Sequence, residues 1–275
     1  MKRMTGRKWG LGVIAAFMLA AGQGNASPFN IDLNFTGGLT PAQEAVFTTA
    51  ADTWESLLTG YQPGIDIASL TINASGVFID GPGGVLGQAG PLPIGLRHQG
   101  GFWLSTRGVM QFDSADLPGL ESGGGFLSVI EHEMAHVMGF GTLWTLNGVY
   151  VNGSGRYTGA NAIAAARTEF GVPGATFVPV ELGGGSGTAN SHWDELNGGA
   201  CCTGFTSSQG DATFELMTGW LNMPAFISQT TVQSFVDIGY VAALIPEPGT
   251  YALMLAGLGL MGFAARRRKQ QHASA

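Results

Sequence analysis

The pentapeptide His132-Glu133-Met134-Ala135-His136 combines residue types and a spacing that can support chemistry. In an α-helix, residues four apart lie on one face, so His132 and His136 can direct imidazole nitrogens to one metal ion at about 2.0–2.1 Å. Glu133 leans to one side of that face, where its carboxylate can take a proton from a metal-bound water. The pattern therefore predicts half of a tetrahedral zinc site together with a general base.

A catalytic zinc site needs a third protein ligand and a fourth position that is open to water. Gly139 follows His136 by three residues, and we expect it to end the helix and turn the chain back beneath the metal. The only histidines downstream are His192 and His272, and His272 lies in the C-terminal tail. His192 is therefore the candidate third ligand by elimination.

Other side chains remain open as the third ligand. His98 precedes the helix in a glycine-rich stretch, and Glu181 or Glu195 would give a site with a glutamate ligand. The only cysteines, Cys201 and Cys202, are adjacent and cannot tie distant segments together. Their thiolates would form a structural site that competes with the histidines. We therefore prefer His192 and expect a fold that disulfides do not staple.

The order of these residues resembles the leishmanolysin-like branch of the metzincin peptidases. That branch has several dozen residues between the glycine after the helix and a histidine followed by tryptophan, as in Ser191-His192-Trp193. The compact metzincin pattern would instead have a histidine at the position of Thr142. The resemblance runs from about residue 109 to residue 240.

The resemblance also implies a methionine turn at Phe214-Glu215-Leu216-Met217-Thr218-Gly219, with Met217 as a hydrophobic floor below the metal and not a ligand. It implies a zinc-dependent endopeptidase that cleaves a protein or peptide substrate and binds one Zn²⁺ through His132, His136 and His192. The chain departs from the family in two ways. It lacks the many disulfides and the pro-segment cysteine of the eukaryotic members, and Gly219 stands where some metzincins have a tyrosine ligand.

The predicted reaction is direct hydrolysis of a peptide bond, in which Glu133 deprotonates a zinc-bound water and later protonates the leaving nitrogen. The alternative from another class is a non-catalytic adhesion protein of the envelope or biofilm matrix, in which zinc only orders the C-terminal half. A structural zinc site needs no carboxylate at position 133, so Glu133 favours the peptidase.

The helices and strands that we expect around these residues indicate an α+β fold. Apolar residues at helical spacing, with caps and glycine stops, predict four helices, over residues 41–58, 126–138, 159–170 and 230–236. Alternation of apolar and polar residues predicts a strand at 31–35 and a strand pair at 65–79, and the glycine and proline content predicts a long surface loop at 81–101. We expect an edge strand at 109–113 that can pair with an extended substrate, followed by irregular chain up to residue 121. We therefore expect a metzincin-like arrangement of an N-terminal twisted sheet with a packing helix and the zinc-binding helix, and an irregular C-terminal subdomain with the methionine turn.

The two ends of the chain have the sequence patterns of export signals. Residues 1–26 combine basic residues, an apolar run and small residues before the expected cleavage point, as in a secretory signal peptide. At the other end, Pro246-Glu247-Pro248 precedes a mostly apolar stretch at 251–265 and a basic cluster at 266–269. As a helix that stretch would rise about 22 Å against a hydrocarbon core of about 30 Å, which predicts a short, transient transmembrane segment.

This C-terminal arrangement resembles the PEP-CTERM sorting signal, which implies processing by an exosortase-type enzyme in a Gram-negative bacterium. The product would be exported across the inner membrane to the cell envelope, the cell surface or the extracellular matrix, and only the sorting segment would meet a membrane. The predicted organisation is a signal peptide at 1–26, a metallopeptidase domain at 27–245 with subdomains 27–139 and 140–245, and the sorting signal at 246–275.

The charge of the predicted mature body limits its partners. With four arginines, no lysine and 18 acidic residues between positions 27 and 245, its formal charge is about −14. Such a charge argues against nucleic acid or anionic lipid as a partner. Asp113 and Asp116 could bind calcium through their oxygens, but the sequence contains no recognised calcium loop and so does not support that ion.

Overall fold

A four-stranded mixed sheet organises the N-terminal half of the protein. The computed structural model describes residues 27–195, 205–243 and 261 of the 275-residue chain. The strands lie in the order β1-β3-β7-β4; the first three are parallel and β4 is antiparallel to β7. Their bounds are Ile31–Phe35 for β1, Leu70–Val77 for β3, Arg107–Asp113 for β7 and Gly87–Pro91 for β4.

Two expectations for this sheet are wrong. Residues 65–79 contain one strand, β3, and not a strand pair, because the neighbours of β3 are β1 and β7 from elsewhere in the chain. The stretch 81–101 is not one loop but contains β4, the 3-10 helix η1 (Pro93–Gly95) and β5 (Leu96–Gln99). Glycine and proline have low strand propensity, but backbone pairing with β7 overrides it in β4.

The segment 109–113 is also not an edge strand. It belongs to β7, which is paired with β3 on one side and with β4 on the other. β4 is therefore the edge of the sheet on this side, and it lies along the helix that contains the histidine pentapeptide.

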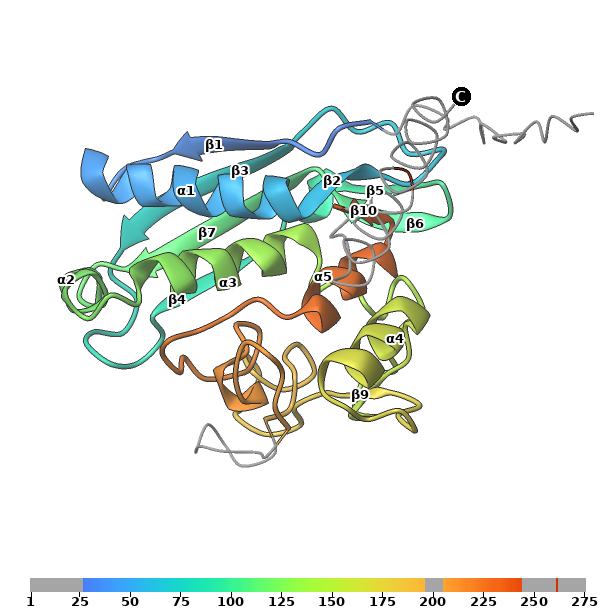
Figure 1. Cartoon of the computed structure of the whole chain (residues 1–275). Helices are drawn as coiled ribbons and strands as arrows, with labels where there is room; N and C mark the ends of the chain where they lie inside the picture. Colours follow the sequence, from blue (N-terminus) through green and yellow to red (C-terminus); the bar gives the residue numbers. More distant parts are fainter. Residues whose placement is uncertain (1–26, 196–204, 244–260, 262–275) are drawn as a thin grey trace, which may run out of the picture.

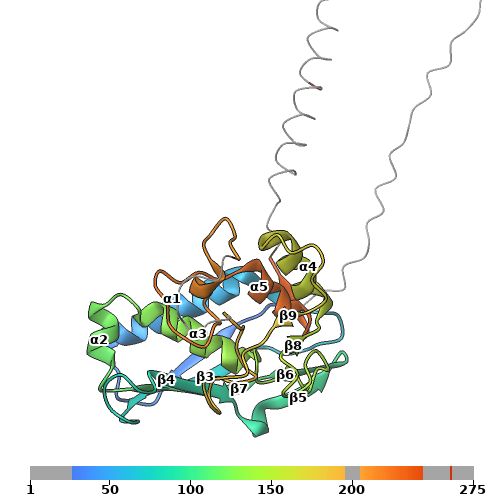
Figure 2. The same cartoon turned by 90° about the horizontal axis from the view of Figure 1, so that it is seen from below.

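Two helices cover one face of the sheet, as Figures 1 and 2 show from two directions. They are α1 (Pro41–Leu57) and α3 (Phe126–Met138), and both match the predicted helices closely. A capping box opens α1, in which Gln43 N–H donates to the Thr40 hydroxyl and Thr40 N–H donates to the Gln43 side-chain oxygen. The buried rings of Phe47, Phe112 and Phe126 meet edge to face and join the two helices to the sheet.

The close packing of α3 on β7 depends on the absence of a side chain at residue 108. A Cβ at Gly108 would lie 2.1 Å from Cγ1 of Val137. We expect Gly108→Ala to lower the free energy of unfolding by about 1–3 kcal/mol, the usual cost of overpacking a core. Denaturant unfolding of the purified protein measures this loss. The double variant Gly108→Ala/Val137→Ala, which lacks the clashing methyl group, should lose less than the sum of the two single changes; strict additivity would contradict the clash.

The described residues of the C-terminal half are mostly irregular, and two of their helices cap each other. They are α4 (Ala160–Glu169) and α5 (Gln229–Val236), close to the predicted helices. The Glu169 carboxylate at the end of α4 accepts hydrogen bonds from the N–H groups of Gln229 and Thr230 at 2.9 Å. The Asp237 carboxylate at the end of α5 accepts from the N–H groups of Asn161 and Ala162 at 2.9 and 3.0 Å. Each carboxylate thus satisfies the free donors at the start of the other helix.

The other elements are short. One of them, α2 (Leu117–Ser122), lies where the sequence suggested irregular chain; with six residues it is too short to show helical periodicity. The rest are β2 (Leu58–Tyr61) paired with β10 (Tyr240–Ala242), β5 paired with β6 (Phe102–Ser105), β8 (Arg156–Tyr157) paired with β9 (Val178–Pro179), and the 3-10 helix η2 (Ala212–Phe214). The described chain is α+β, as predicted.

Several predictions fall outside the described residues. These are the signal peptide at 1–26, the pair Cys201 and Cys202, and the sorting segment at 246–275 apart from Met261. The division of the body into subdomains 27–139 and 140–245 stays a prediction. Among the described helices, none combines the length and the apolar character needed to cross a membrane.

Candidate metal centre

The end of α3 turns the chain toward the predicted third ligand. Gly139 adopts a φ of 124° directly after the helix, and its N–H donates to the carbonyl of Ala135 at 3.1 Å. Gly141 has a φ of 69°, and a Cβ there would lie 2.4 Å from the carbonyl oxygen of Ser191. Only glycine combines this conformation with so close an approach. The chain after α3 therefore passes directly against the residue that precedes His192.

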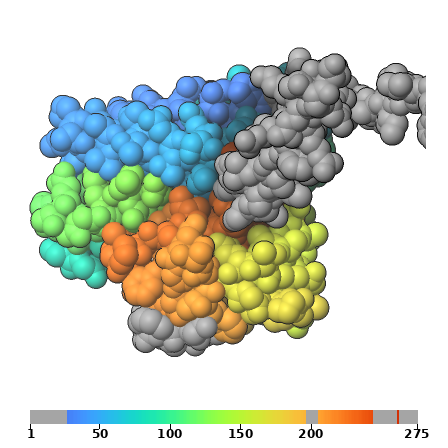
Figure 3. Space-filling model, in the orientation of Figure 1, coloured from blue at the N-terminus to red at the C-terminus, as the bar shows by residue number. Residues whose placement is uncertain are grey.

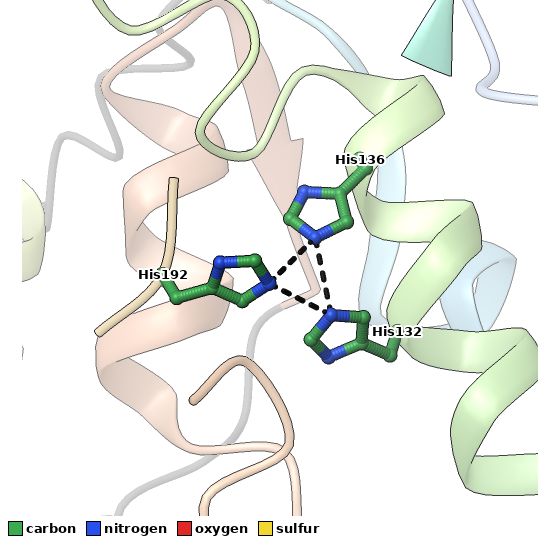
Figure 4. A group of neighbouring side chains, drawn as sticks. All are labelled: His132, His136 and His192. Carbon is green, nitrogen blue, oxygen red and sulfur yellow. Dashed lines mark hydrogen bonds between the residues drawn. The ribbon is translucent and has the colours of Figure 1, made fainter. Parts of the chain in front are cut away.

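The imidazoles of His132 and His136 on α3 and of His192 point toward one another (Figure 4). The Nε2 atoms of His132 and His136 are 3.1 Å apart, and each lies 3.0 Å from Nε2 of His192. His136 and His192 are buried and His132 is half-buried. The structure thus brings together the three histidines that the sequence suggested, although residue 192 is 56 positions from residue 136.

The other ring nitrogen of each histidine is held by a backbone carbonyl. Nδ1 of His132 donates to Leu216 at 2.7 Å, Nδ1 of His136 to Phe140 at 3.0 Å, and Nδ1 of His192 to Thr188 at 2.8 Å. Because a carbonyl only accepts hydrogen bonds, each Nδ1 carries the proton and each Nε2 of a neutral ring presents a lone pair. Three lone pairs facing one point repel one another unless a cation lies between them.

Burial keeps these rings neutral. It lowers the pKa of His136 to about 3, with a further contribution from the neighbouring His132. Burial likewise lowers the pKa of His132, and it holds the pKa of His192 well below its usual range, with His136 and His132 adding to the effect. Neutral imidazole is the form that ligates metals.

The geometry of the three atoms fits a zinc ion. Nitrogens at about 2.0–2.1 Å from a tetrahedral zinc ion lie about 3.3–3.4 Å apart, a few tenths of an ångström more than the separations found here. Carbonyl acceptors on the far ring nitrogens are the usual outer partners of ligating histidines. The residues present therefore fit a metal that prefers three nitrogen ligands and a fourth, open position.

Glu133 follows His132 directly on α3, and its side chain lies on the side of the helix that faces β4. A Cβ at Gly87, the first residue of β4, would be 3.2 Å from Cγ of Glu133. Burial raises the pKa of Glu133 to about 8. A buried carboxyl group with a raised pKa next to a candidate metal site is the kind of group that exchanges protons in catalysis.

Met217 and Trp193, the residue that follows His192, are both buried and are joined through their backbones. Met217 is fully buried, and its carbonyl accepts a hydrogen bond from Trp193 N–H at 3.0 Å. The Trp193 ring stacks on Trp144 with centroids 4.9 Å apart and meets Phe140 and Tyr157 edge to face. Figure 3 shows this C-terminal segment, in orange, lying against the green surface of α3. The role of Met217 as a floor below the metal stays a prediction.

The rival ligands lie elsewhere. In residues 27–195 and 205–243, His132, His136 and His192 form the one group of three or more potential ligands whose atoms lie within 4.8 Å of one another. His98 is exposed and packs on Trp103 with ring centroids 5.0 Å apart, and the Glu181 carboxylate accepts a hydrogen bond from Gly183 N–H. Glu195 is buried outside the group.

Asp113 and Asp116, whose oxygens could in principle bind calcium, hold a loop in place instead. Asp113 accepts hydrogen bonds from the N–H groups of Ala115, Asp80 and Gly81 at 2.8 Å, and Asp116 accepts one from Gly83 at 2.7 Å. The bond from Ala115, with those from residues 80 and 81, lowers the pKa of Asp113 to about 2. These carboxylates hold the connection before β4 in place, and the structure gives calcium no support.

Sequence reasoning missed several residues around this centre. Gly141 gave no separate signal among 45 glycines, although its spacing of two residues from Gly139 could have marked a second tight turn. Glu215 was noticed only as part of the methionine-turn motif, yet its buried carboxylate accepts hydrogen bonds from Met217, Ser228 and Thr231. The carbonyls of Phe140, Thr188 and Leu216 have no signature in a sequence.

Comparison with known proteins agrees with the resemblance seen in the motifs. The model of the leishmanolysin family matches residues 105–244, about half of the chain, and the model of the PEP-CTERM protein-sorting motif matches residues 244–269. A leishmanolysin homologue of Crithidia fasciculata is 32% identical over 124 residues, which cover 42% of this chain and 17% of that protein. The match thus spans about a sixth of the relative's length. With a family match of this extent around the histidine cluster, the chain belongs to the leishmanolysin family of metallopeptidases.

Proposed function

We propose that this protein is an exported zinc-dependent endopeptidase of the metzincin type. The observation that carries the proposal is the convergence of three neutral Nε2 atoms within 3.1 Å of one another, each on a ring whose Nδ1 is held by a carbonyl. His132, His136 and His192 would hold the ion. Family membership supports metallopeptidase chemistry, and the burial of Glu133 beside the cluster supports catalysis over a purely structural site.

In the proposed reaction Glu133 moves the protons. A bound zinc ion would supply a Lewis acid for the peptide carbonyl and would acidify a water molecule. Glu133 accepts the proton of the attacking water and then delivers it to the nitrogen of the departing amine, so hydrolysis needs no covalent enzyme intermediate. The apolar surroundings that raise the pKa of Glu133 favour this return of the proton.

An extended peptide would bind along β4. This strand is the sheet edge beside α3, and its first residue, Gly87, lies against Glu133. Pairing with the free backbone groups of an edge strand fixes the direction of a substrate while reading little of its sequence. We therefore propose a protein or peptide substrate bound in an extended conformation.

Metal removal tests the proposed activity. We expect casein or peptide cleavage by the purified protein to fall to background after treatment with 1,10-phenanthroline, because the three histidines then hold no Lewis acid. One equivalent of zinc should restore cleavage, whereas calcium should not, since three imidazoles do not suit a hard oxygen-seeking cation. Full cleavage by protein that elemental analysis shows to be free of metal would refute the proposal.

The sorting motif extends the proposal to location. We propose export across the inner membrane of a Gram-negative bacterium, processing of the tail by an exosortase-type enzyme, and action at the envelope, the surface or the extracellular matrix. The body charge of about −14 supports protein substrates over nucleic acid.

A further inference from the structure

Glu215 is a buried carboxylate in a body that has no lysine and four arginines. Only 4% of its surface is exposed, and the interactions that hold it are hydrogen bonds. Burial raises its pKa, and hydrogen bonds from Thr231, Ser228 and Met217 oppose that rise. Burying a charged group costs free energy unless hydrogen-bond partners replace its lost hydration. The segments that supply those partners are therefore the segments that the group holds together.

Four donors surround this carboxylate. One oxygen accepts from the Met217 N–H. The other accepts from the Ser228 N–H at 3.1 Å, from the Ser228 hydroxyl at 2.8 Å and from the Thr231 hydroxyl. Glu215 therefore ties the turn at Met217 to the first residues of α5.

The same turn orients His132. The carbonyl of Leu216, the residue between Glu215 and Met217, accepts the Nδ1–H of His132 at 2.7 Å. A shift of this turn would tilt or release the His132 ring, because that carbonyl is the acceptor that fixes the ring's tautomer and direction.

A second path leads from Glu215 to His192. The Trp193 indole N–H donates to the Thr231 hydroxyl at 2.8 Å, and that hydroxyl in turn donates to Glu215. The Trp193 backbone N–H donates to the Met217 carbonyl at 3.0 Å. The residue that follows His192 is thus fixed at both its backbone and its side chain to groups that Glu215 holds.

We propose that Glu215 is a positioning residue of the metal centre, which holds His132 through the Leu216 carbonyl and His192 through Trp193. This inference rests on the proposed zinc site, and it assigns to one buried carboxylate the alignment of two ligands that lie 60 positions apart. Glu215 does not contact the reacting atoms.

Glu169 provides a matched control. Its carboxylate also binds the start of α5, through the N–H groups of Gln229 and Thr230 and the Thr230 hydroxyl, all at 2.9 Å. None of these partners leads to a ligand histidine. If Glu215 acted only as a staple of α5, then Glu169→Gln and Glu215→Gln would disturb the metal centre equally.

The test compares the zinc dissociation constant of the full protein and its variants by chelator competition, together with the visible spectrum of the Co²⁺-substituted forms. Glu215→Gln puts an amide N–H₂ against donors, and we expect zinc binding about 10- to 100-fold weaker, the range for changes in outer partners of metal ligands, with an altered cobalt spectrum. Glu169→Gln should lower the melting temperature and leave both readouts unchanged. Thr231→Val removes both hydrogen bonds of the threonine hydroxyl, the one from Trp193 and the one to Glu215, and should weaken zinc binding about fivefold or more.

The outcomes distinguish a failure of the proposed zinc-dependent function from a failure of the positioning role of Glu215. Wild-type protein that binds no zinc would refute the proposed function. If wild type binds zinc, an affinity of Glu215→Gln within threefold of wild type, or an equal loss in Glu169→Gln, would refute the positioning role alone. Should Glu215→Gln fail to fold, the Thr231→Val result decides, and unchanged affinity in that variant would count against the inference.

Discussion

Glu133→Gln is expected to lower the rate of peptide hydrolysis by about 100- to 10,000-fold, the usual contribution of a general acid–base group. Glutamine has nearly the same shape but cannot accept the proton of the attacking water. Because Glu133 does not belong to the group of three ligand residues, the variant should still bind one zinc ion per chain. The loss should therefore appear in kcat, measured with a quenched peptide substrate at saturating zinc.

Glu131→Gln is the control for this change. Glu131 lies on the same helix and is also buried with a raised pKa, caused first by burial, but its side chain bonds to Thr53 of α1. We expect it to retain most of the wild-type activity. Equal activity in Glu133→Gln and wild type would exclude the proposed mechanism. Zinc-loaded wild type without any peptidase activity would favour the non-catalytic adhesion protein.

His192→Ala is expected to weaken zinc binding by more than about 100-fold, which exceeds the largest losses usual for changes in outer partners. Two imidazoles on one helix leave two open positions, so the ion would be held only as a loosely bound chelate. Peptidase activity should be lost with the metal. Zinc content after dialysis against a weak chelator, measured by elemental analysis, gives the result.

His98→Ala is the matched control, because His98 is exposed and lies in β5 outside the ligand group. It should bind zinc as wild type does. A full equivalent of zinc in His192→Ala would show that another residue completes the site, and a glutamate such as Glu181 or Glu195 would then need to reach it.

The helices could be predicted because their signals are local. The Thr40 cap and Pro41 mark the start of α1, and Gly139 marks the end of α3. The family resemblance seen in the motifs after α3 is confirmed by the match over residues 105–244. Gly139 and the two helical histidines lie within eight residues, so their mutual placement follows from helix geometry alone.

The strand β4 beside Glu133 could not be predicted, because its cause is not local. β4 has the sequence Gly-Gln-Ala-Gly-Pro, which on its own reads as loop, and it becomes a strand only through pairing with β7. The same holds for Glu215, whose partners lie up to 16 positions away, and for Gly141, whose close neighbour is Ser191. Contacts of this kind depend on the folded backbone and not on a pattern along the chain.

The reciprocal bonds of Glu169 and Asp237 limit how far this protein can be shortened. The stretch between Gly139 and His192 looks like a dispensable insert when compared with the compact metzincin pattern, yet α4 within it supplies the carboxylate that α5 requires and receives one in return. Excising α4 would remove the backbone N–H partners of Asp237 and the carboxylate that binds the start of α5, the helix whose Thr231 accepts the Trp193 indole N–H. A minimal peptidase engineered from this chain would have to keep both helices or replace the pair as a unit.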